Sequence, residues 1–204
     1  MNLANKLTMV RIFLTIALIT ILLFPFYTVN ITFPKLLVGA ITVDTKYLIA
    51  AGIFTIASLT DFFDGYVARK YNMVTDFGKM VDAIADKMLV NSTLIVLASQ
   101  GFVAPIIVVI IVLRDSVVNT IKMIAGSKGK VVAAIKSGKL KTACLMVGIV
   151  LTMCYNLPFE LFGLDIANFL LVVATILSII SGIQYYLLNK EIIFEKKAEI
   201  KTSK

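Results

Sequence analysis

Six long hydrophobic stretches, separated by short polar segments, constrain the fold of this chain more than any other feature. They cover approximately residues 7–26, 46–69, 78–99, 102–124, 139–158 and 166–189. A bilayer-spanning helix needs about 20 mostly apolar residues, and apolar residues make up 59% of this chain. The sequence therefore predicts an all-α integral membrane protein with six transmembrane helices. We expect one domain, residues 1–190, and a short charged tail, residues 191–204.

The longest uncharged run, Met88–Leu113, contains 26 residues. One helix could cover it, but Gln100, Gly101 and Pro105 interrupt it with residues that are typical of a turn. We therefore expect two spans that meet in a tight turn near residue 100.

Lysine and arginine are distributed unevenly between the segments that connect the spans. With the N-terminus inside, the outer loops carry only Lys35 and Lys46, whereas the inner segments carry 16 of the 20 basic residues. Basic residues concentrate on the cytoplasmic side of membrane proteins, so we expect a multi-pass protein of the cell membrane with both termini in the cytoplasm. Contacts with anionic lipid head groups explain most of these residues. The net charge of +8 therefore gives no indication of nucleic-acid binding.

Four aspartates lie in segments that otherwise have the composition of membrane helices: Asp61, Asp64, Asp82 and Asp86. A charged residue near the centre of a spanning helix costs roughly 2.5–3.5 kcal/mol. Residues three or four apart share a face of a helix, so the two aspartates of each pair project together, near the cytoplasmic ends of two antiparallel helices. Four unpaired carboxylates this close could not all stay ionised. One or two divalent cations would resolve the conflict, and pairing with nearby basic residues is the structural alternative.

The chain contains no histidine and two cysteines, Cys144 and Cys154. Without imidazole, a metal ion must be held by oxygen ligands, which favours Mg²⁺, Mn²⁺ or Ca²⁺ over zinc. The cysteines lie ten residues apart in one apolar segment and are expected to be buried free thiols.

Together, the four aspartates and the absence of histidine predict a polar metal site near the cytoplasmic face. Sites of this kind clamp a phosphoryl group between two ions.

The acidic residues belong to a longer pattern: Asp61-x-x-Asp64-Gly65-x-x-Ala68-Arg69, then eight residues, then Gly78-x-x-x-Asp82-x-x-x-Asp86. In every specified position this pattern resembles the signature of the CDP-alcohol phosphotransferases. The stretches NKLTMVR (5–11) and GKLKT (138–142) are similar to elements of one branch of that family, the bacterial phosphatidylglycerophosphate synthases. The resemblance covers nearly the whole chain. It implies transfer of a phosphatidyl group from CDP-diacylglycerol to glycerol 3-phosphate, with release of CMP.

The resemblance also implies a role for each matching residue. Mg²⁺ or Mn²⁺, with two ions expected, would be ligated by Asp61, Asp64, Asp82 and Asp86, and Asp86 would also be the general base that takes the proton of the acceptor hydroxyl. The CDP-linked donor would lie against Gly65, Ala68, Arg69 and Gly78. Close helix packing is the alternative role of the two glycines, and Arg69 could brace the aspartates instead. Thr8 and Arg11 are donor-site or packing residues.

A phosphorylated acceptor needs a second group of cations, because phosphate binds convergent basic side chains. The candidates are Arg114, Lys139 and Lys141. Arg114 could instead pair with Asp115 or with the acidic cluster, and the two lysines could reach lipid head groups. Asp115 stands where the branch usually has glutamate, which leaves the identity of the acceptor open. Ala83 stands where the branch often has proline, which affects local helix geometry.

The sequence leaves three other functional interpretations open. The same chemistry could use another acceptor: serine, inositol phosphate or a lipid alcohol. Carboxylates inside a membrane also occur in ion-coupled transporters, but these place them near mid-membrane and often have inverted repeats, and no repeat is visible here. A structural lipid-binding scaffold would leave the four aspartates unexplained. Relatives in the resembled family are commonly homodimers, so the resemblance implies a homodimer.

Overall fold

The computed structural model describes residues 3–39, 41–70, 76–130, 132–133 and 135–194, of which residues 3–6, 61–70, 76–80, 82–83 and 191–194 are described without their side chains. Six α-helices make up most of this part of the chain: α1 (Leu3–Leu23), α2 (Thr45–Lys70), α3 (Asp76–Ser99), α4 (Pro105–Ser127), α5 (Lys136–Met153) and α6 (Ile166–Phe194). All six predicted helices are therefore present, with their ends shifted by a few residues.

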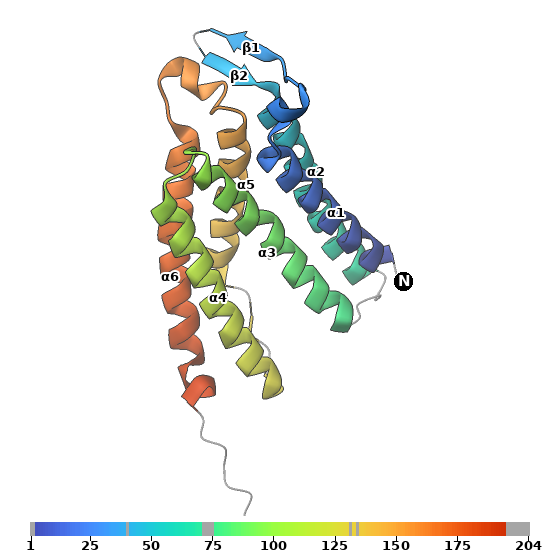
Figure 1. Cartoon of the computed structure of the whole chain (residues 1–204). Helices are drawn as coiled ribbons and strands as arrows, with labels where there is room; N and C mark the ends of the chain where they lie inside the picture. The colour runs from blue at the N-terminus through green and yellow to red at the C-terminus, as the bar shows by residue number, and fades with distance from the viewer. Residues whose placement is uncertain (1–2, 40, 71–75, 131, 134, 195–204) are drawn as a thin grey trace, which may run out of the picture.

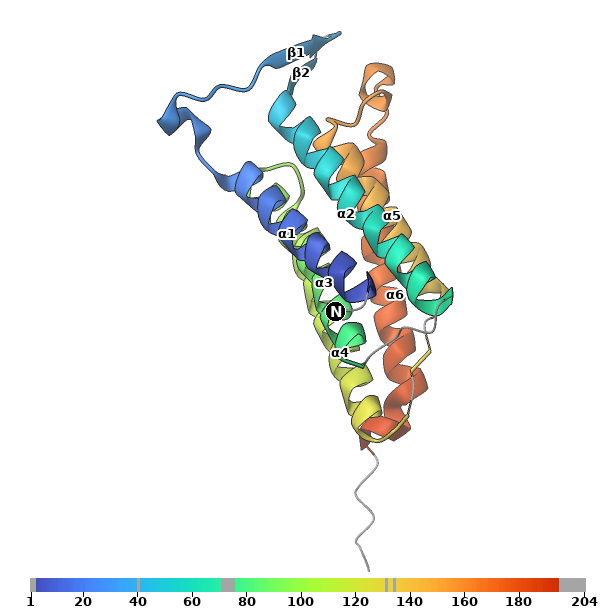
Figure 2. The ribbon, with the colours of Figure 1, turned by 90° about the vertical axis from the view of Figure 1, so that its right-hand side faces the viewer.

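The helices form one elongated bundle in which successive helices run in opposite directions (Figures 1 and 2). One half packs α1 against α2 and α3, the other packs α6 against α4 and α5, and α2 contacts α5 between them. We call the end at which α2 leads into α3 and α4 leads into α5 the inner end. The opposite end, where α3 turns into α4 and α5 leads into α6, is the outer end.

Backbone chemistry explains where the helices end. Gly101 has a φ of +81° in the turn between α3 and α4, and Pro105 is the first residue of α4, a position at which its missing N–H costs nothing. The predicted turn near residue 100 is thus confirmed. α5 ends at Met153, earlier than predicted, because Tyr155 and Asn156 both have a φ of +56°, which no α-helix accommodates.

A short β-hairpin at the outer end was not predicted. After a 3-10 turn (η1, Phe26–Val29), strands β1 (Lys35–Val38) and β2 (Ile41–Asp44) pair antiparallel, with Lys35 opposite Asp44. Gly39 supplies a φ of +64° in the connection, a conformation that glycine adopts without strain. Strands of four residues produce too little alternation to stand out from an apolar loop, which is why the hairpin escaped the sequence patterns.

The bundle carries apolar side chains on its outside as well as in its core. Each of the six helices exposes large ones, among them Phe13, Ile56, Ile95, Leu113, Val147 and Ile176, whereas Arg11, Thr15, Lys141, Ser178 and Ser181 are buried. Exposed apolar patches of this extent are typical of membrane proteins. Over residues 166–190, α6 is the one helix in the described chain that is long and apolar enough to cross a membrane, while residues 7–23 and 45–60 form shorter apolar stretches.

Cys144 and Cys154 are free cysteines, as predicted, but both are partly exposed and not fully buried. Cys144 lies within α5 and Cys154 directly follows the end of this helix. No role in the site follows from their positions.

Candidate functional site

A cavity of about 740 Å³ lies between the helices, toward the inner end. We call it the basic cavity, because the described side chains that line it include five basic and two acidic ones, a formal net charge of +3 among these residues. These residues are Lys87, Arg114, Lys122, Lys139 and Lys141, with Asp86 and Asp115. The three predicted acceptor residues therefore come together in one cavity, and Asp86 lines the same cavity. A net positive charge in a partly buried cavity favours a multiply charged anion.

Arg114 lies near the middle of α4, and its guanidinium is held by groups of two helices. Its Nη1 donates to Oδ1 of Asp115 at 2.9 Å, and its Nη2 donates to Oγ of Ser181 on α6 at 2.6 Å. The Arg114–Asp115 ion pair, predicted from the sequence as an alternative role for Arg114, is thus present. Arg114 nevertheless lines the cavity. Within the described chain its Nε has no hydrogen-bond partner. Each Nη atom carries two N–H groups, and the two bonds above use one of each, so the guanidinium keeps donor capacity for a bound anion.

Lys141 is 3% exposed and lies in the second turn of α5. Its Nζ contacts both carboxylate oxygens of Asp115, at 2.8 and 2.9 Å. Asp115 therefore bridges Arg114 of α4 and Lys141 of α5. A buried ammonium group needs such a counter-charge, because an unpaired buried charge costs several kcal/mol. One carboxylate shared by two cations leaves this trio with a net positive charge.

Lys139 and Lys122 lie on the exposed side of the basic cavity, and Lys87 is half-buried in α3, beside Asp86. The Nζ of Lys122 is 5.5 Å from the centre of the Tyr185 ring, which also faces Arg114. Neither Lys122 nor Lys87 is among the acceptor residues predicted from the sequence. The spacing of Lys122 from Arg114 could have suggested that both line one site, because Lys122 lies about two helical turns after Arg114 and on a similar face.

The signature residues lie on α2 and α3, close to where these helices lead into each other. Asp61, Asp64, Gly65, Ala68 and Arg69 are in the last third of α2, and Gly78, Asp82 and Asp86 are in the first half of α3. The helical spacing assumed for each aspartate pair is thus present in the backbone. The side chains of all these residues except Asp86 lie outside the described residues. Among the side chains that are described, no group of three or more His, Cys, Asp or Glu residues could hold a metal ion.

Thr8 and Arg11 lie in the half of α1 nearer the inner end and are almost completely buried, with exposures of 3% and 0%. Both make polar or electrostatic interactions within the protein. α1 packs against α2 and α3, the two helices that carry the aspartates. A fully buried guanidinium requires acidic or carbonyl partners nearby, so the position of Arg11 is suited to bracing an acidic cluster.

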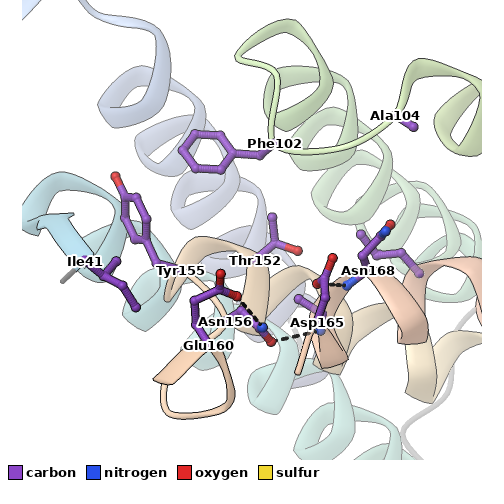
Figure 3. Close-up of a pocket in the computed structure, with 11 residues that line it drawn as sticks. Ile41, Phe102, Ala104, Thr152, Tyr155, Asn156, Glu160, Asp165 and Asn168 are labelled. Atoms are coloured by element: carbon purple, nitrogen blue, oxygen red, sulfur yellow. Dashed lines mark hydrogen bonds between the residues drawn. The ribbon is translucent and has the colours of Figure 1, made fainter. Parts of the chain in front are cut away.

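A second pocket, of about 410 Å³, lies at the outer end between α5, α6 and the start of α4. Figure 3 shows Asn156 beside Glu160 among the residues that line it. Its Nδ2 donates to Oε2 of Glu160 at 2.9 Å and to the carbonyl of Leu164 at 2.6 Å, while its Oδ1 accepts from the N–H of Ala167 at 3.0 Å. We call it the outer pocket. Its central amide is fully used in holding the α5–α6 connection, which includes the 3-10 turn η2 (Phe159–Phe162).

Comparison with known proteins points to one family. The family model described as CDP-alcohol phosphatidyltransferase matches residues 1–182. The chain is 38% identical over 190 residues to the CDP-diacylglycerol–glycerol-3-phosphate 3-phosphatidyltransferase of Bacillus subtilis (strain 168), covering 93% of this chain and 96% of that protein. It is 34% identical over 186 residues to the protein of the same name from Rickettsia bellii (strain RML369-C), covering 91% and 93%.

A third match covers less of both chains. The chain is 38% identical over 139 residues to the probable phosphatidylglycerophosphate synthase of Mycobacterium tuberculosis (strain CDC 1551 / Oshkosh), covering 68% of this chain and 64% of that protein.

Proposed function

The chain belongs to the CDP-alcohol phosphatidyltransferase family, and from this premise we propose that it transfers a phosphatidyl group from CDP-diacylglycerol to glycerol 3-phosphate. The products would be phosphatidylglycerol phosphate and CMP. Similarity over nearly the full length of relatives that carry the name of this activity supports the proposal. The reaction is a step in the synthesis of membrane phospholipids.

The basic cavity is the observation that carries the choice of acceptor. The five basic side chains among its described lining residues suit a phosphorylated alcohol, whereas serine and a lipid alcohol bring no phosphate that would use these cations. Arg114 is partly buried and Lys141 is buried, and both contact counter-charged or polar groups, which fixes their positions. Fixed cations recognise the charge and geometry of a phosphate with little ordering cost on binding.

The donor chemistry of the acidic residues fits Mg²⁺ or Mn²⁺. Four carboxylates on two adjoining helices, in a chain without histidine, are hard oxygen ligands of the kind these ions prefer. We propose Asp61, Asp64, Asp82 and Asp86 as the ligands of two ions. When bound, such ions supply positive charge that stabilises the transferring phosphoryl group.

Residues of the chain would carry out proton transfer and hold the acceptor. Asp86, which lines the basic cavity, takes the proton from the acceptor hydroxyl as that oxygen attacks the phosphorus of the phosphatidyl group. The bond from this phosphorus to the CMP oxygen breaks, and CMP leaves with the electron pair. Arg114, Lys139 and Lys141 hold the acceptor phosphate, so that the hydroxyl is positioned for attack.

The donor would occupy the side of the site formed by α2 and the start of α3. There Gly65, Ala68 and Gly78 leave room for the cytidine and its diphosphate. Arg69 contacts a donor phosphate or braces the aspartates of α2. Buried Arg11 and Thr8 support the same region from α1.

The protein would sit in the cell membrane with six spans, and both termini would face the cytoplasm. The apolar outer surface of all six helices and the position of the basic cavity toward the inner end support this placement. The diacylglycerol part of the donor would enter from the inner leaflet. A homodimer is proposed by analogy with the family, and no role in nucleic-acid binding is proposed.

A panel of acceptors tests the proposal directly. Purified protein in detergent is given CDP-diacylglycerol, Mg²⁺ and either glycerol 3-phosphate, inositol phosphate or serine, and CMP and lipid products are measured. We expect CMP release only with glycerol 3-phosphate, together with phosphatidylglycerol phosphate. CMP release with serine or inositol phosphate alone would identify that compound as the acceptor in place of glycerol 3-phosphate. The absence of CMP release with all three compounds would contradict the proposed reaction.

A further inference from the structure

One face of α6 is shaped around the side chain of Arg114. Ser181, Gly182 and Tyr185 lie within little more than one helical turn, and each meets Arg114 in a different way. We call these three residues the α6 cradle. Neither the signature of the family nor the basic stretch at the start of α5 includes them.

Ser181 provides the polar contact. It is completely buried, its Oγ accepts a hydrogen bond from Nη2 of Arg114 at 2.6 Å, and its hydroxyl donates to the carbonyl of Ser178 at 3.1 Å. Because the hydroxyl hydrogen is used within α6, the oxygen lone pair is directed to the guanidinium. A hydrogen bond to a charged group is stronger than one between neutral groups.

Gly182 provides the space. A Cβ atom at this position would lie 3.1 Å from Cγ of Arg114, closer than ordinary van der Waals contact. Any larger residue would therefore displace the arginine stem. Gly138, at the start of α5, lies on another side of the guanidinium, where a Cβ would be 3.6 Å from Nη2. The arginine side chain thus passes between two glycines of different helices.

Tyr185 provides an aromatic surface and a link to α5. The Cζ atom of Arg114 is 5.6 Å from the centre of its ring, within the range of a cation–π contact. Its hydroxyl accepts a hydrogen bond from the backbone N–H of Ile135 at 3.3 Å. Ile135 directly precedes α5, the helix that carries Lys139 and Lys141. One residue of α6 therefore contacts the arginine and also the segment that leads to the two lysines.

We propose that the α6 cradle holds Arg114 in the position required for binding the acceptor phosphate, and that Ser181 is a positioning residue for this step. The inference rests on the proposed function. Arginine side chains are flexible. If Arg114 were free to change rotamer, part of the free energy of binding the acceptor phosphate would be spent on ordering its side chain. The cradle removes this cost before the acceptor arrives. It thereby acts on acceptor binding and not on the donor or on the chemical step.

The first test compares Ser181→Ala with Ser178→Ala. Both serines are completely buried on α6, one turn apart, but the Oγ of Ser178 has no hydrogen-bond partner in the described chain. We expect Ser181→Ala to raise the KM for glycerol 3-phosphate about tenfold, with kcat and the KM for CDP-diacylglycerol changed less than twofold. Ser178→Ala should leave all three unchanged. Equal KM values for the acceptor in the two variants would overturn the inference.

A second pair of variants covers the case in which Ser181→Ala does not fold. Gly182→Ala should displace Arg114 and raise the acceptor KM by a similar factor, whereas Gly52→Ala, where a Cβ would meet nothing within 4 Å, should not. An unchanged acceptor KM in Gly182→Ala would count against the cradle.

Binding of inorganic phosphate separates failure of this inference from failure of the proposed function. Heat stabilisation of the protein by phosphate reports binding without turnover. We expect phosphate to stabilise the wild type and Ser178→Ala, and to stabilise Ser181→Ala only at about tenfold higher concentration. If the wild type transfers nothing to glycerol 3-phosphate, the proposed function fails, and this measurement still decides about the cradle. Identical phosphate responses in all three proteins, or none in the wild type, would overturn it.

Discussion

The two ends of the bundle use polar residues for different purposes. In the basic cavity at the inner end, Asp115 is shared between Arg114 and Lys141, and basic side chains outnumber acidic ones among the described lining residues. In the outer pocket (Figure 3), the side-chain amide of Asn156 makes three hydrogen bonds, two to the α5–α6 connection and one to the start of α6, so that both its nitrogen and its oxygen are used. Polar groups that satisfy one another stabilise a fold, whereas an uncompensated set of charges is suited to bind a ligand. This difference between the two ends supports our proposal that the reaction takes place at the inner end.

The strongest test of this comparison removes one carboxylate from each end. Asp86→Asn should lower the transfer rate by about 10³-fold, because it removes the proposed base and one metal ligand. Asp165→Asn is the matched control: its Oδ1 accepts the N–H of Asn168 at the start of α6, a role that asparagine also fills. The rate of CMP release by equal amounts of folded protein measures both. Similar losses in the two variants would remove the distinction between the ends.

The next effect concerns the acceptor alone. Arg114→Gln keeps much of the side-chain length but loses the charge, and we expect the KM for glycerol 3-phosphate to rise about 30- to 100-fold, the scale of a lost contact to a charged group. Lys35→Gln, in the hairpin at the outer end, is the control and should have no effect. Initial rates over a range of both substrates give the two KM values. A rise in the KM for CDP-diacylglycerol instead would place Arg114 in the donor site.

The outer pocket should respond in stability and not in catalysis. Asn156→Ala leaves the N–H of Ala167 without the amide oxygen that accepts it and removes one of the two donors to the carbonyl of Leu164, which keeps the N–H of Ile166. Alanine also tolerates a φ of +56° less well than asparagine. We expect the free energy of unfolding to fall by about 2–3 kcal/mol. Thermal unfolding in detergent measures this, and both KM values below the unfolding temperature should remain those of the wild type. An altered KM would mean that the outer pocket takes part in the reaction.

The smallest effect is expected from Glu160→Gln. This change removes a charge from the outer pocket but keeps an oxygen that can accept from Nδ2 of Asn156. The free energy of unfolding should change by less than about 0.5 kcal/mol, as for most surface substitutions, and activity should not change. A large loss of activity would show that negative charge matters at both ends.

The sequence was sufficient for the helices and for selecting three basic residues that the structure places in one cavity. Apolar length predicted all six helices, and Arg114, Lys139 and Lys141 stood out because basic residues in or beside apolar segments need a reason to be there. The structure brings these three into one cavity with Asp86. The shared carboxylate of Asp115 was anticipated only as a possible partner of Arg114, and its contact with Lys141 joins two helices.

Other features depend on tertiary packing and could not be predicted. Ser181, Gly182 and Tyr185 are ordinary residues of an apolar helix until α6 is placed against α4. Their spacing in α6 carries no charge pattern that would distinguish them from packing residues. The β-hairpin was missed for a local reason, since its two strands are only four residues each. The metal ligands on α2 and the start of α3 remain predictions from the signature.

The most direct test of the whole account is metal-dependent CMP release from CDP-diacylglycerol in the presence of glycerol 3-phosphate. Purified protein is stripped with a chelator and then titrated with Mg²⁺ or Mn²⁺, in parallel with Asp86→Asn. We predict no release after chelation, full recovery on adding either ion to the wild type, and no recovery in Asp86→Asn. Undiminished release in the presence of chelator, or a fully active Asp86→Asn protein, would contradict the account.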